Sequence, residues 1–181
     1  NPDGALFSSD FRAPERLFSL LMQAAGRAGR DAQMQRFSPC EMWVQTFHPQ
    51  HPLFEALKQH DYPAFAAQQL SDRQQAQLPP FSFQALVRAE ARNQAAAQAF
   101  LNAIRDAGAG LAKSLHIDIY PAVPMAMQRV ANVERAQMLI ECQSRKALQQ
   151  FLSIWHPQVH ALRSEHRQVI RWAIDVDPLA I

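Results

Sequence analysis

The most constraining feature of this 181-residue chain is an apolar helical run that ends in two Gly-Arg pairs. Apolar residues recur in the run at i, i+3, i+4 and i+7, which predicts one buried helix face: Leu17, Leu20, Leu21 and Ala24. Pro14 suits the first turn of this helix, because its φ is already helical and that turn needs no backbone donor. The opposite face then carries three polar side chains at i, i+4 and i+7: Gln23, Arg27 and Arg30.

Two arginines on one edge of a packed helix have two interpretations. Forked guanidinium groups are good receptors for phosphate oxygens, and Gly26 and Gly29 would let a ligand approach the backbone closely. Alternatively, the Arg-Ala-Gly-Arg segment is a solvated helix end, and Gly29 simply serves as its C-cap. The tetrapeptide alone does not separate these interpretations.

The longer pattern Gln-x-x-Gly-Arg-x-Gly-Arg, over residues 23–30, resembles the last conserved motif of superfamily 2 helicases, which their second RecA-like lobe carries. Residues 3–16, DGALFSSDFRAPER, narrow the resemblance. Further short segments agree with it: Val44-Gln-Thr46, the Pro-x-His-Pro of residues 49–52, Asp61-Tyr62, Pro79-Pro80 and residues 172–178. On these motifs the chain is identified as a member of the primosomal protein N′ family, the replication-restart helicases of bacteria.

The resemblance implies an ATP-dependent DNA helicase that moves 3′→5′ along single-stranded DNA, recognises stalled or abandoned replication forks and assembles the primosome there. Arg30 matches the family's arginine finger, Arg27 matches its neighbour on the triphosphate, and Gln23 matches the glutamine that couples the nucleotide to the lobe interface. A fixed guanidinium stabilises the charge that spreads over the γ-phosphate during transfer. The resemblance therefore assigns these three residues to catalysis, with ATP and Mg²⁺ as ligands of the full-length parent.

Other parts of such an enzyme are missing from the 181 residues. The sequence has no Gly-x-x-x-x-Gly-Lys-Ser/Thr phosphate loop and no Asp-Glu-x-His box, which the family places in its first lobe. The family's zinc-binding cysteines lie in an insertion upstream of residue 1, so we expect structural zinc in the parent only and no metal site here. We therefore expect a C-terminal piece of a larger protein, inactive as an ATPase by itself.

Composition agrees with a globular chain in the reducing cytoplasm. Cys40 and Cys142 give no disulfide framework, although Cys40 stands where the family usually has glycine. No signal peptide is present, and no apolar stretch approaches the ~18–20 residues that a membrane helix needs. A formal charge of +2 is too small to indicate nucleic-acid binding by itself.

Residues 1–78 are expected to form the C-terminal part of the second RecA-like lobe, with connecting helices. We predict a turn and a short extended segment over residues 1–9, a strand over 42–47, and a helical region over 53–75 that is interrupted at Tyr62-Pro63. His48 and His51 lack a third ligand in metal-binding spacing and are expected to cap the turn instead.

The pattern changes at the Leu-Pro-Pro of residues 78–80, and residues 79–181 are predicted as a separate α/β domain. We expect the following elements: a strand over 81–90, a helix over 93–107 that ends before Gly108, a strand over 115–120, a hairpin about Ala131-Asn132, a helix from a Ser144 cap to about Trp155 that Pro157 stops, and a strand over 168–176. The order strand–helix–strand–strand–helix–strand predicts a split βαβ sandwich with an antiparallel sheet. The resemblance implies that this domain is ribosomal-protein-S10-like.

The basic side chains of this domain offer only binding chemistry. Arg129 and Arg135 bracket the hairpin and could track the phosphates of branched or single-stranded DNA, or they could belong to a solvated face of mixed charge. Arg145 and Lys146 open a helix, with Gln149 one turn later, and this arrangement suits an acidic peptide. The resemblance implies that the family binds the acidic tail of single-stranded-DNA-binding protein, and we predict this helix start as the docking site.

Two functions stay open for the parent protein. It is an ATP-driven helicase, or it is a non-catalytic paralogue that only binds fork DNA and protein partners. An intact phosphate loop upstream would favour the enzyme. A third, weaker interpretation treats residues 79–181 as an RNA-binding ribosomal-type module, and the motifs of residues 1–46 argue against it.

Overall fold

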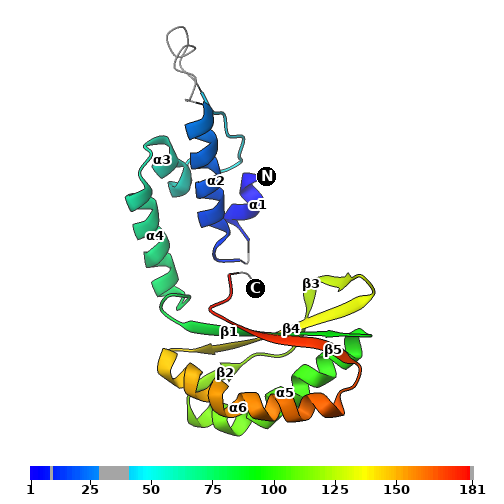
Figure 1. Cartoon of the computed structure of the whole chain (residues 1–181). Helices are drawn as coiled ribbons and strands as arrows, with labels where there is room; N and C mark the ends of the chain where they lie inside the picture. The colour runs from blue at the N-terminus through cyan, green and yellow to red at the C-terminus, as the bar shows by residue number, and fades with distance from the viewer. Residues whose placement is uncertain (9, 29–40, 180–181) are drawn as a thin grey trace. The chain divides into compact units, whose positions relative to one another are not determined.

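The computed structural model describes residues 1–8, 10–28 and 41–179 (Figure 1). The chain divides into two compact units, residues 1–76 (unit 1) and residues 77–179 (unit 2). The division lies two residues before the predicted boundary at residue 78. Among the described residues, no helix is both long and apolar enough to cross a membrane.

The described part of unit 1 contains helices α1 (Pro2–Leu6), α2 (Ala13–Ala28), α3 (Pro52–Lys58) and α4 (Tyr62–Gln75). Helix α1 corrects the prediction of an extended segment, because Asn1 caps it by accepting the Asp3 N–H at 3.1 Å. Helices α3 and α4 confirm the helical region and its interruption before Tyr62. Asp61 caps α4 by accepting the Ala64 N–H at 2.9 Å.

The core of unit 1 forms where α2 packs against α3 and α4. Phe18 of α2 stacks on Phe65 of α4, with ring centroids 4.2 Å apart. The buried side chains of this core are Leu17, Phe18, Leu53, Phe54, Ala56, Leu57 and Phe65. Because Phe18 faces the other helices, the buried face of α2 is rotated from the predicted one, and Leu20 and Ala24 are exposed.

Residues 41–46 are not a strand, although a strand had been predicted over 42–47. Their burial nevertheless alternates as in a strand, since Met42, Val44 and Thr46 are partly buried between exposed neighbours. A strand needs the backbone groups of a neighbouring strand, and within the described part of unit 1 there is none. The predicted strand is therefore wrong for the described residues of unit 1, although the alternating burial of a strand is present.

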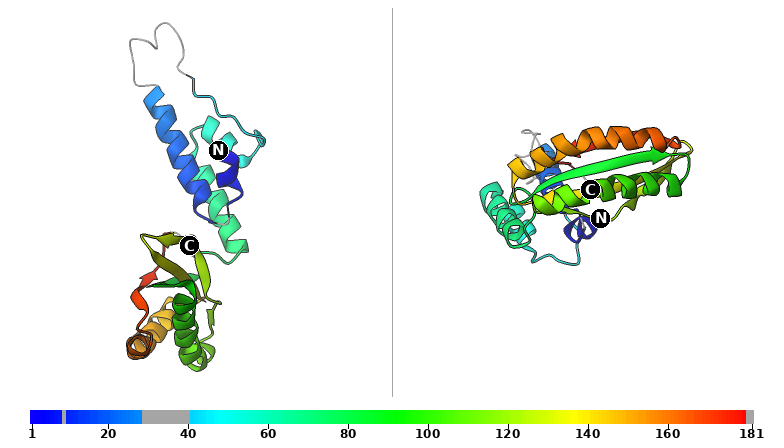
Figure 2. Two further views of the ribbon diagram at one scale, coloured as in Figure 1. Left: turned by 90° about the vertical axis from the view of Figure 1, so that its right-hand side faces the viewer. Right: turned by 90° about the horizontal axis from the view of Figure 1, so that it is seen from below.

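Unit 2 contains a five-stranded antiparallel sheet with order β2-β4-β1-β5 (Figure 1). Its strands are β1 (Phe83–Ala91), β2 (Ile117–Ile119), β3 (Val123–Val130), β4 (Val133–Cys142) and β5 (Val169–Val176). Strands β2 and β3 pair with opposite ends of β4, so three strands lie between the two helices where the predicted order has two. Helices α5 (Gln94–Ser114) and α6 (Arg145–Glu165) run side by side against one face of the sheet (Figure 2). The predicted α/β domain with an antiparallel sheet is therefore confirmed, with one strand more than the predicted order.

Local signals in unit 2 are also confirmed. Ala131 and Asn132 have φ of 49° and 63°, as a two-residue hairpin turn between β3 and β4 requires. Ser144 caps α6 by accepting the Ala147 N–H at 3.3 Å. Along β1, alternate residues from Ala85 to Ala89 are buried among the helices.

Both helices of unit 2 are longer than predicted. Gly108 lies inside α5, where a Cβ would be only 2.7 Å from Trp155 Nε1, so this glycine permits close contact between helices. The Trp155 indole donates to the Ile104 carbonyl at 2.8 Å. Pro157 lies inside α6 and does not end it, because Trp155 and Val159 on either side are fully buried. Tertiary packing outweighs both local stop signals.

Candidate functional sites

Gln23 and Arg27 lie one turn apart on the exposed surface of α2, as predicted. Arg27 is in the last turn, where a cation interacts favourably with the negative end of the helix dipole. The Arg27 side chain is exposed, and no ion pair within the described residues involves it. Arg30, the predicted arginine finger, lies outside the described residues.

An open groove of about 850 Å³ lies between α1, α2 and residues 43–47. Large apolar side chains line it and remain exposed to solvent: Leu20 is 63%, Trp43 88% and Phe47 92% exposed. Single exposed apolar residues are ordinary, but several gathered in one groove form a candidate interaction surface.

Asp3 fixes residues 46–47 to α1 on the wall of this groove. The Thr46 hydroxyl donates to one oxygen of Asp3, and the Phe47 N–H donates to the other at 3.2 Å. The hydrogen bond from Thr46 holds the pKa of Asp3 below its ordinary value. Both segments belong to the motifs quoted above, but nothing local in the sequence indicated that they meet.

Asp10 has a structural role at the beginning of α2. It accepts the Arg12 N–H at 2.9 Å and the Arg16 guanidinium at 2.5 Å, at the start of α2. Burial alone would raise the pKa of Asp10, but these hydrogen bonds lower it below its ordinary value. Asp10 thus orients the beginning of the helix that carries Gln23 and Arg27.

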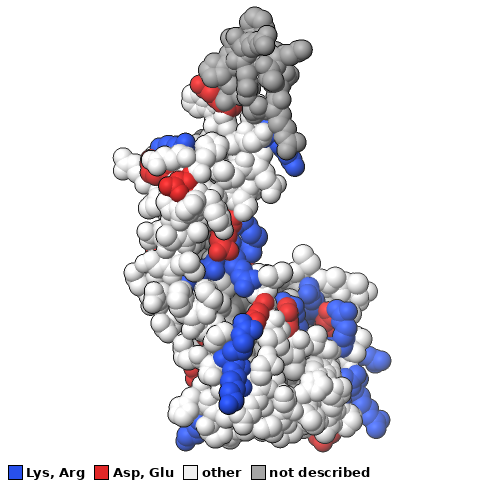
Figure 3. All heavy atoms as spheres, turned by 60° about the vertical axis from the view of Figure 1, so that its left-hand side comes forward, with Lys and Arg blue, Asp and Glu red and all other residues white. Residues whose placement is uncertain are grey.

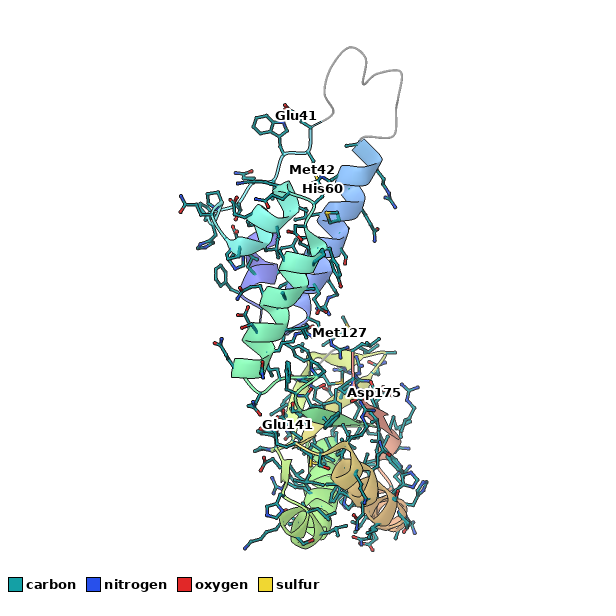
Figure 4. The ribbon with its side chains drawn as sticks, turned by 90° about the vertical axis from the view of Figure 1, so that its left-hand side faces the viewer. Glu41, Met42, His60, Met127, Glu141 and Asp175 are labelled. Carbon is teal, nitrogen blue, oxygen red and sulfur yellow. The ribbon has the colours of Figure 1, made fainter. Side chains whose placement is uncertain are left out.

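A smaller cavity of about 350 Å³ lies near the end of α2. Met42 and His60, both labelled in Figure 4, line it together with Lys58. Most of the remaining lining is apolar and comes from α2 and α3: Ala25, Ala28, Phe54 and Leu57.

Basic side chains are numerous in unit 2, and many have acidic neighbours. Residues 77–179 contain 11 Lys or Arg and 8 Asp or Glu. On the face drawn in Figure 3, basic and acidic side chains lie next to one another. Arg129 lies 3.7 Å from Glu134, and Arg135 lies 3.7 Å from Glu90. The two arginines predicted to track phosphates therefore each have a carboxylate beside them.

The start of α6 brings together three elements of unit 2. Arg145 lies over the ring of Phe83 from β1, 4.8 Å from its centroid, and its guanidinium is 3.1 Å from the Asp177 carboxylate after β5. Lys146 and Gln149 are exposed nearby on α6. Phe83 and Asp177 were not found from the sequence, because each is far from Arg145 along the chain.

Glu141 of β4, labelled in Figure 4, accepts hydrogen bonds from Ser82 at 2.6 Å and from Tyr120 at 3.2 Å. Burial and the Glu141 carboxylate raise the pKa of the Tyr120 hydroxyl. Within the described residues, no group of three His, Cys, Asp or Glu side chains is arranged to hold a metal ion.

The fold and these sites define a two-unit protein, in which a helical unit with an exposed arginine precedes an α/β domain with an antiparallel sheet. Residues 74–179 match the sequence pattern of the family described as "Primosomal protein N C-terminal domain", and the chain belongs to this family. The resemblance deduced from the motifs is confirmed.

Relatives match nearly the whole chain. Replication restart protein PriA of Haemophilus influenzae is 38% identical over 178 residues, which cover 98% of this chain and 23% of that protein. The PriA protein of Synechocystis sp. is 31% identical over 182 residues, covering 99% of this chain and 20% of that protein. This chain thus spans about a fifth of the length of these relatives. The designed protein Foldit4 aligns with 54% of the chain at a TM-score of 0.39 and 5% identity, too weak a likeness to bear on the fold.

Proposed function

We propose that this chain forms the end of the second RecA-like lobe and the C-terminal domain of an ATP-dependent 3′→5′ DNA helicase. In this proposal the parent protein recognises stalled or abandoned forks and restarts replication by primosome assembly in the cytoplasm. The relatives named above, which are replication restart proteins, support this proposal. The α/β domain is proposed to be ribosomal-protein-S10-like.

One observation carries the proposal: an apolar groove lies beside an extended segment, residues 41–46, that has no strand partner within the described residues. A RecA-like lobe buries both faces of a parallel sheet, so a segment at its edge needs neighbours from elsewhere in the lobe. Residues 41–46 have the alternation of a strand, and Leu20, Trp43 and Phe47 are exposed next to them. These are the properties expected where the remainder of such a lobe docks.

Gln23, Arg27 and Arg30 are proposed to face the nucleotide in the full-length protein. ATP with Mg²⁺ would supply the γ-phosphate, whose developing negative charge a guanidinium stabilises. Exposed Gln23 and Arg27 on one side of α2 fit this role. The phosphate loop and a structural zinc site are proposed to lie in other parts of the parent.

Substitution of the proposed finger tests this function. In the full-length protein, Arg30→Ala should leave nucleotide binding largely intact and reduce DNA-stimulated ATP hydrolysis by about 10³-fold or more, because a finger acts mainly on transition-state charge. Arg105→Ala is the matched control, since Arg105 pairs with its neighbour Asp106 in unit 2. The measurement is steady-state ATP hydrolysis with single-stranded DNA.

The outcomes separate the two candidate functions. Near wild-type turnover in Arg30→Ala would remove Arg30 from catalysis. A wild-type full-length protein without any ATPase activity would favour the alternative, a non-catalytic module that binds fork DNA and proteins. For unit 2 by itself, a role in binding is favoured. It has its own sheet and core, and a domain that folds independently can serve as a binding module.

Two binding roles are proposed for unit 2. Arg129 and Arg135, beside the β3–β4 hairpin, are proposed to contact the phosphates of branched fork DNA or single-stranded DNA. Arg145, Lys146 and Gln149 are proposed to bind the acidic tail of single-stranded-DNA-binding protein, because a helix start with two cations attracts a carboxylate. Primosomal proteins are the remaining proposed partners.

Charge reversal at the start of α6 tests the second role. Arg145→Glu in the full-length protein should weaken binding of an acidic, aromatic-ended peptide by about 1–3 kcal/mol, the usual range for hydrogen bonds to charged groups. Lys113→Glu makes the same charge change at the end of α5 and should leave the affinity unchanged. Equal affinities of wild type and Arg145→Glu in a peptide titration would end this proposal.

A further inference from the structure

A pair of histidines on the outer surface of α6 was missed in the sequence. His156 and His160 are four residues apart, but α6 had been predicted to end near Trp155 because of Pro157. Since the helix continues to Glu165, the two side chains lie on the same side, one turn apart. Their ring centroids are 4.6 Å apart with the rings at 74°, and both residues are exposed.

Neighbouring packing holds this pair in place. Trp155 and Val159 directly precede the two histidines along α6. Both are fully buried, so the helix cannot rotate about its axis. Trp172 of β5 lies behind the pair, with its ring centroid 5.5 Å from that of His156 and 5.0 Å from that of His160. The indole limits the rotamers open to both imidazoles and places a fluorophore next to them.

We propose that His156 and His160 form a two-histidine chelating site for a late first-row transition-metal ion, the class that includes Cu²⁺ and Zn²⁺. Neutral imidazole nitrogens bind such ions at about 2.0–2.1 Å, and Cu²⁺ binds most tightly in the series. Histidines at i and i+4 of a helix are the spacing by which zinc peptidases hold their metal. Small rotations of exposed side chains 4.6 Å apart suffice to direct one nitrogen of each toward a common ion.

The neighbouring residues define what this site does. Zinc peptidases carry a glutamate base directly after the first histidine, whereas Pro157 stands at that position here. The described residues supply no third metal ligand, so solvent or a ligand from another molecule completes the coordination. The site therefore binds a metal ion in exchange with solvent and has no hydrolytic base.

Metal titration of the untagged 181-residue chain tests the site. CuCl₂, and ZnCl₂ in a second series, are titrated in a buffer without chelating amines, with calorimetry for affinity and tryptophan fluorescence for location. We expect one ion per chain, reversed by a chelator. His156→Asn and His160→Asn should each weaken binding at least about tenfold, because each removes one arm of a chelate.

Two control variants make the result specific. His116→Asn removes a histidine at the end of α5 and should leave the affinity unchanged; its φ of 54° is one that asparagine tolerates well. Trp172→Phe should keep calorimetric binding while reducing the quenching by Cu²⁺. Wild-type affinity in both His156→Asn and His160→Asn would overturn the proposal, as would equal weakening in His116→Asn. If an asparagine variant fails to fold by circular dichroism, the corresponding glutamine variant replaces it.

Discussion

The two units of this chain cover their apolar surface in different ways. In unit 2, two helices close one face of an antiparallel sheet, and the largest core side chains, such as Trp155, Phe100 and Phe151, have no exposed surface. In unit 1, a small core around Phe18 and Phe65 is closed, while Leu20, Trp43 and Phe47 remain exposed around a groove. The core of unit 2 is therefore larger and more fully closed than the core of unit 1.

The difference follows from topology. The strands of unit 2 are antiparallel and are joined by a hairpin and by two connections that contain helices. Each strand therefore finds its pairing partner within the same unit of about a hundred residues. Residues 41–46 of unit 1 have strand alternation but no strand beside them within the described residues. Tight packing should therefore make unit 2 sensitive to added volume, whereas the exposed surfaces of unit 1 should tolerate change.

The same glycine substitution in each unit should have opposite effects. Gly108→Ala should destabilise the chain by about 1–3 kcal/mol, the usual cost of overpacking, because a Cβ there lies 2.7 Å from the buried Trp155 indole. Gly26→Ala in α2 should stabilise unit 1 by up to about 1 kcal/mol through helix propensity, since the added Cβ has no described atom within 4 Å beyond the neighbouring backbone of its own helix. Urea unfolding followed by circular dichroism measures both.

Gly110→Ala is the matched control within α5, because its Cβ also meets nothing within 4 Å. It should behave like Gly26→Ala and stabilise its helix. Equal effects of Gly108→Ala and Gly110→Ala would mean that the contact between Gly108 and Trp155 does not limit the packing of unit 2.

Local signals predicted much of unit 2, and its helix lengths show where they fail. The Ser144 cap and the Ala131-Asn132 turn depend on residues next to one another, and both are present. Gly108 and Pro157 are local stop signals too, yet α5 and α6 continue through them. Trp155 of α6 is buried against Gly108 of α5, which is far away in sequence. This contact cannot be predicted from the sequence of either helix alone.

The candidate sites on α2 and α6 were also predictable only where they depend on residues close together in sequence. Helical periodicity placed Gln23 and Arg27 on one exposed face of α2, and the structure agrees. The partners of Arg145, which are Phe83 and Asp177, come from strands distant in sequence and could not be deduced. The predicted buried position of Leu20 was wrong because periodicity gives a helix face but not the neighbour that it packs against.

Substitution of exposed apolar residues in the groove of unit 1 is a second test of the difference between the two units. In this chain, Trp43→Ser should change the free energy of unfolding by no more than about 0.5 kcal/mol, as is usual for surface substitutions. In the full-length protein, where the remainder of the lobe is proposed to cover the groove, the same substitution should cost about 3 kcal/mol. Unfolding in urea, measured for both proteins, gives the comparison.

Phe47→Ser is a second variant of the same kind, since Phe47 lines the groove and is 92% exposed. Trp155→Ala, in the core of unit 2, should cost about 3–5 kcal/mol in either protein. Equal small effects of Trp43→Ser in the two proteins would show that the groove stays open in the parent.

The smallest expected difference between the units is a pH dependence confined to unit 1. The His51 Nδ1 accepts the Leu53 N–H at 3.2 Å and caps α3, which requires a neutral imidazole. Burial, together with the charge of His48, lowers the pKa of His51, although Asp72 opposes the shift. Because the folded pKa is below the unfolded one, this stabilisation is complete above pH ~6.5 and is lost as the pH falls through the folded pKa.

Lowering the pH from 7.5 to 5.5 should therefore speed hydrogen exchange in α3 by an amount that corresponds to less than about 1 kcal/mol, the scale of one cap. Carboxylates stay ionised over this range, so histidines dominate the change. His51→Asn replaces the cap with one that does not titrate and should remove the pH dependence, after correction for intrinsic exchange. His60→Asn, at a φ of 53° that asparagine tolerates, should retain it. An unchanged pH dependence in His51→Asn would show that the His51 cap of α3 is not the source of the pH dependence of unit 1.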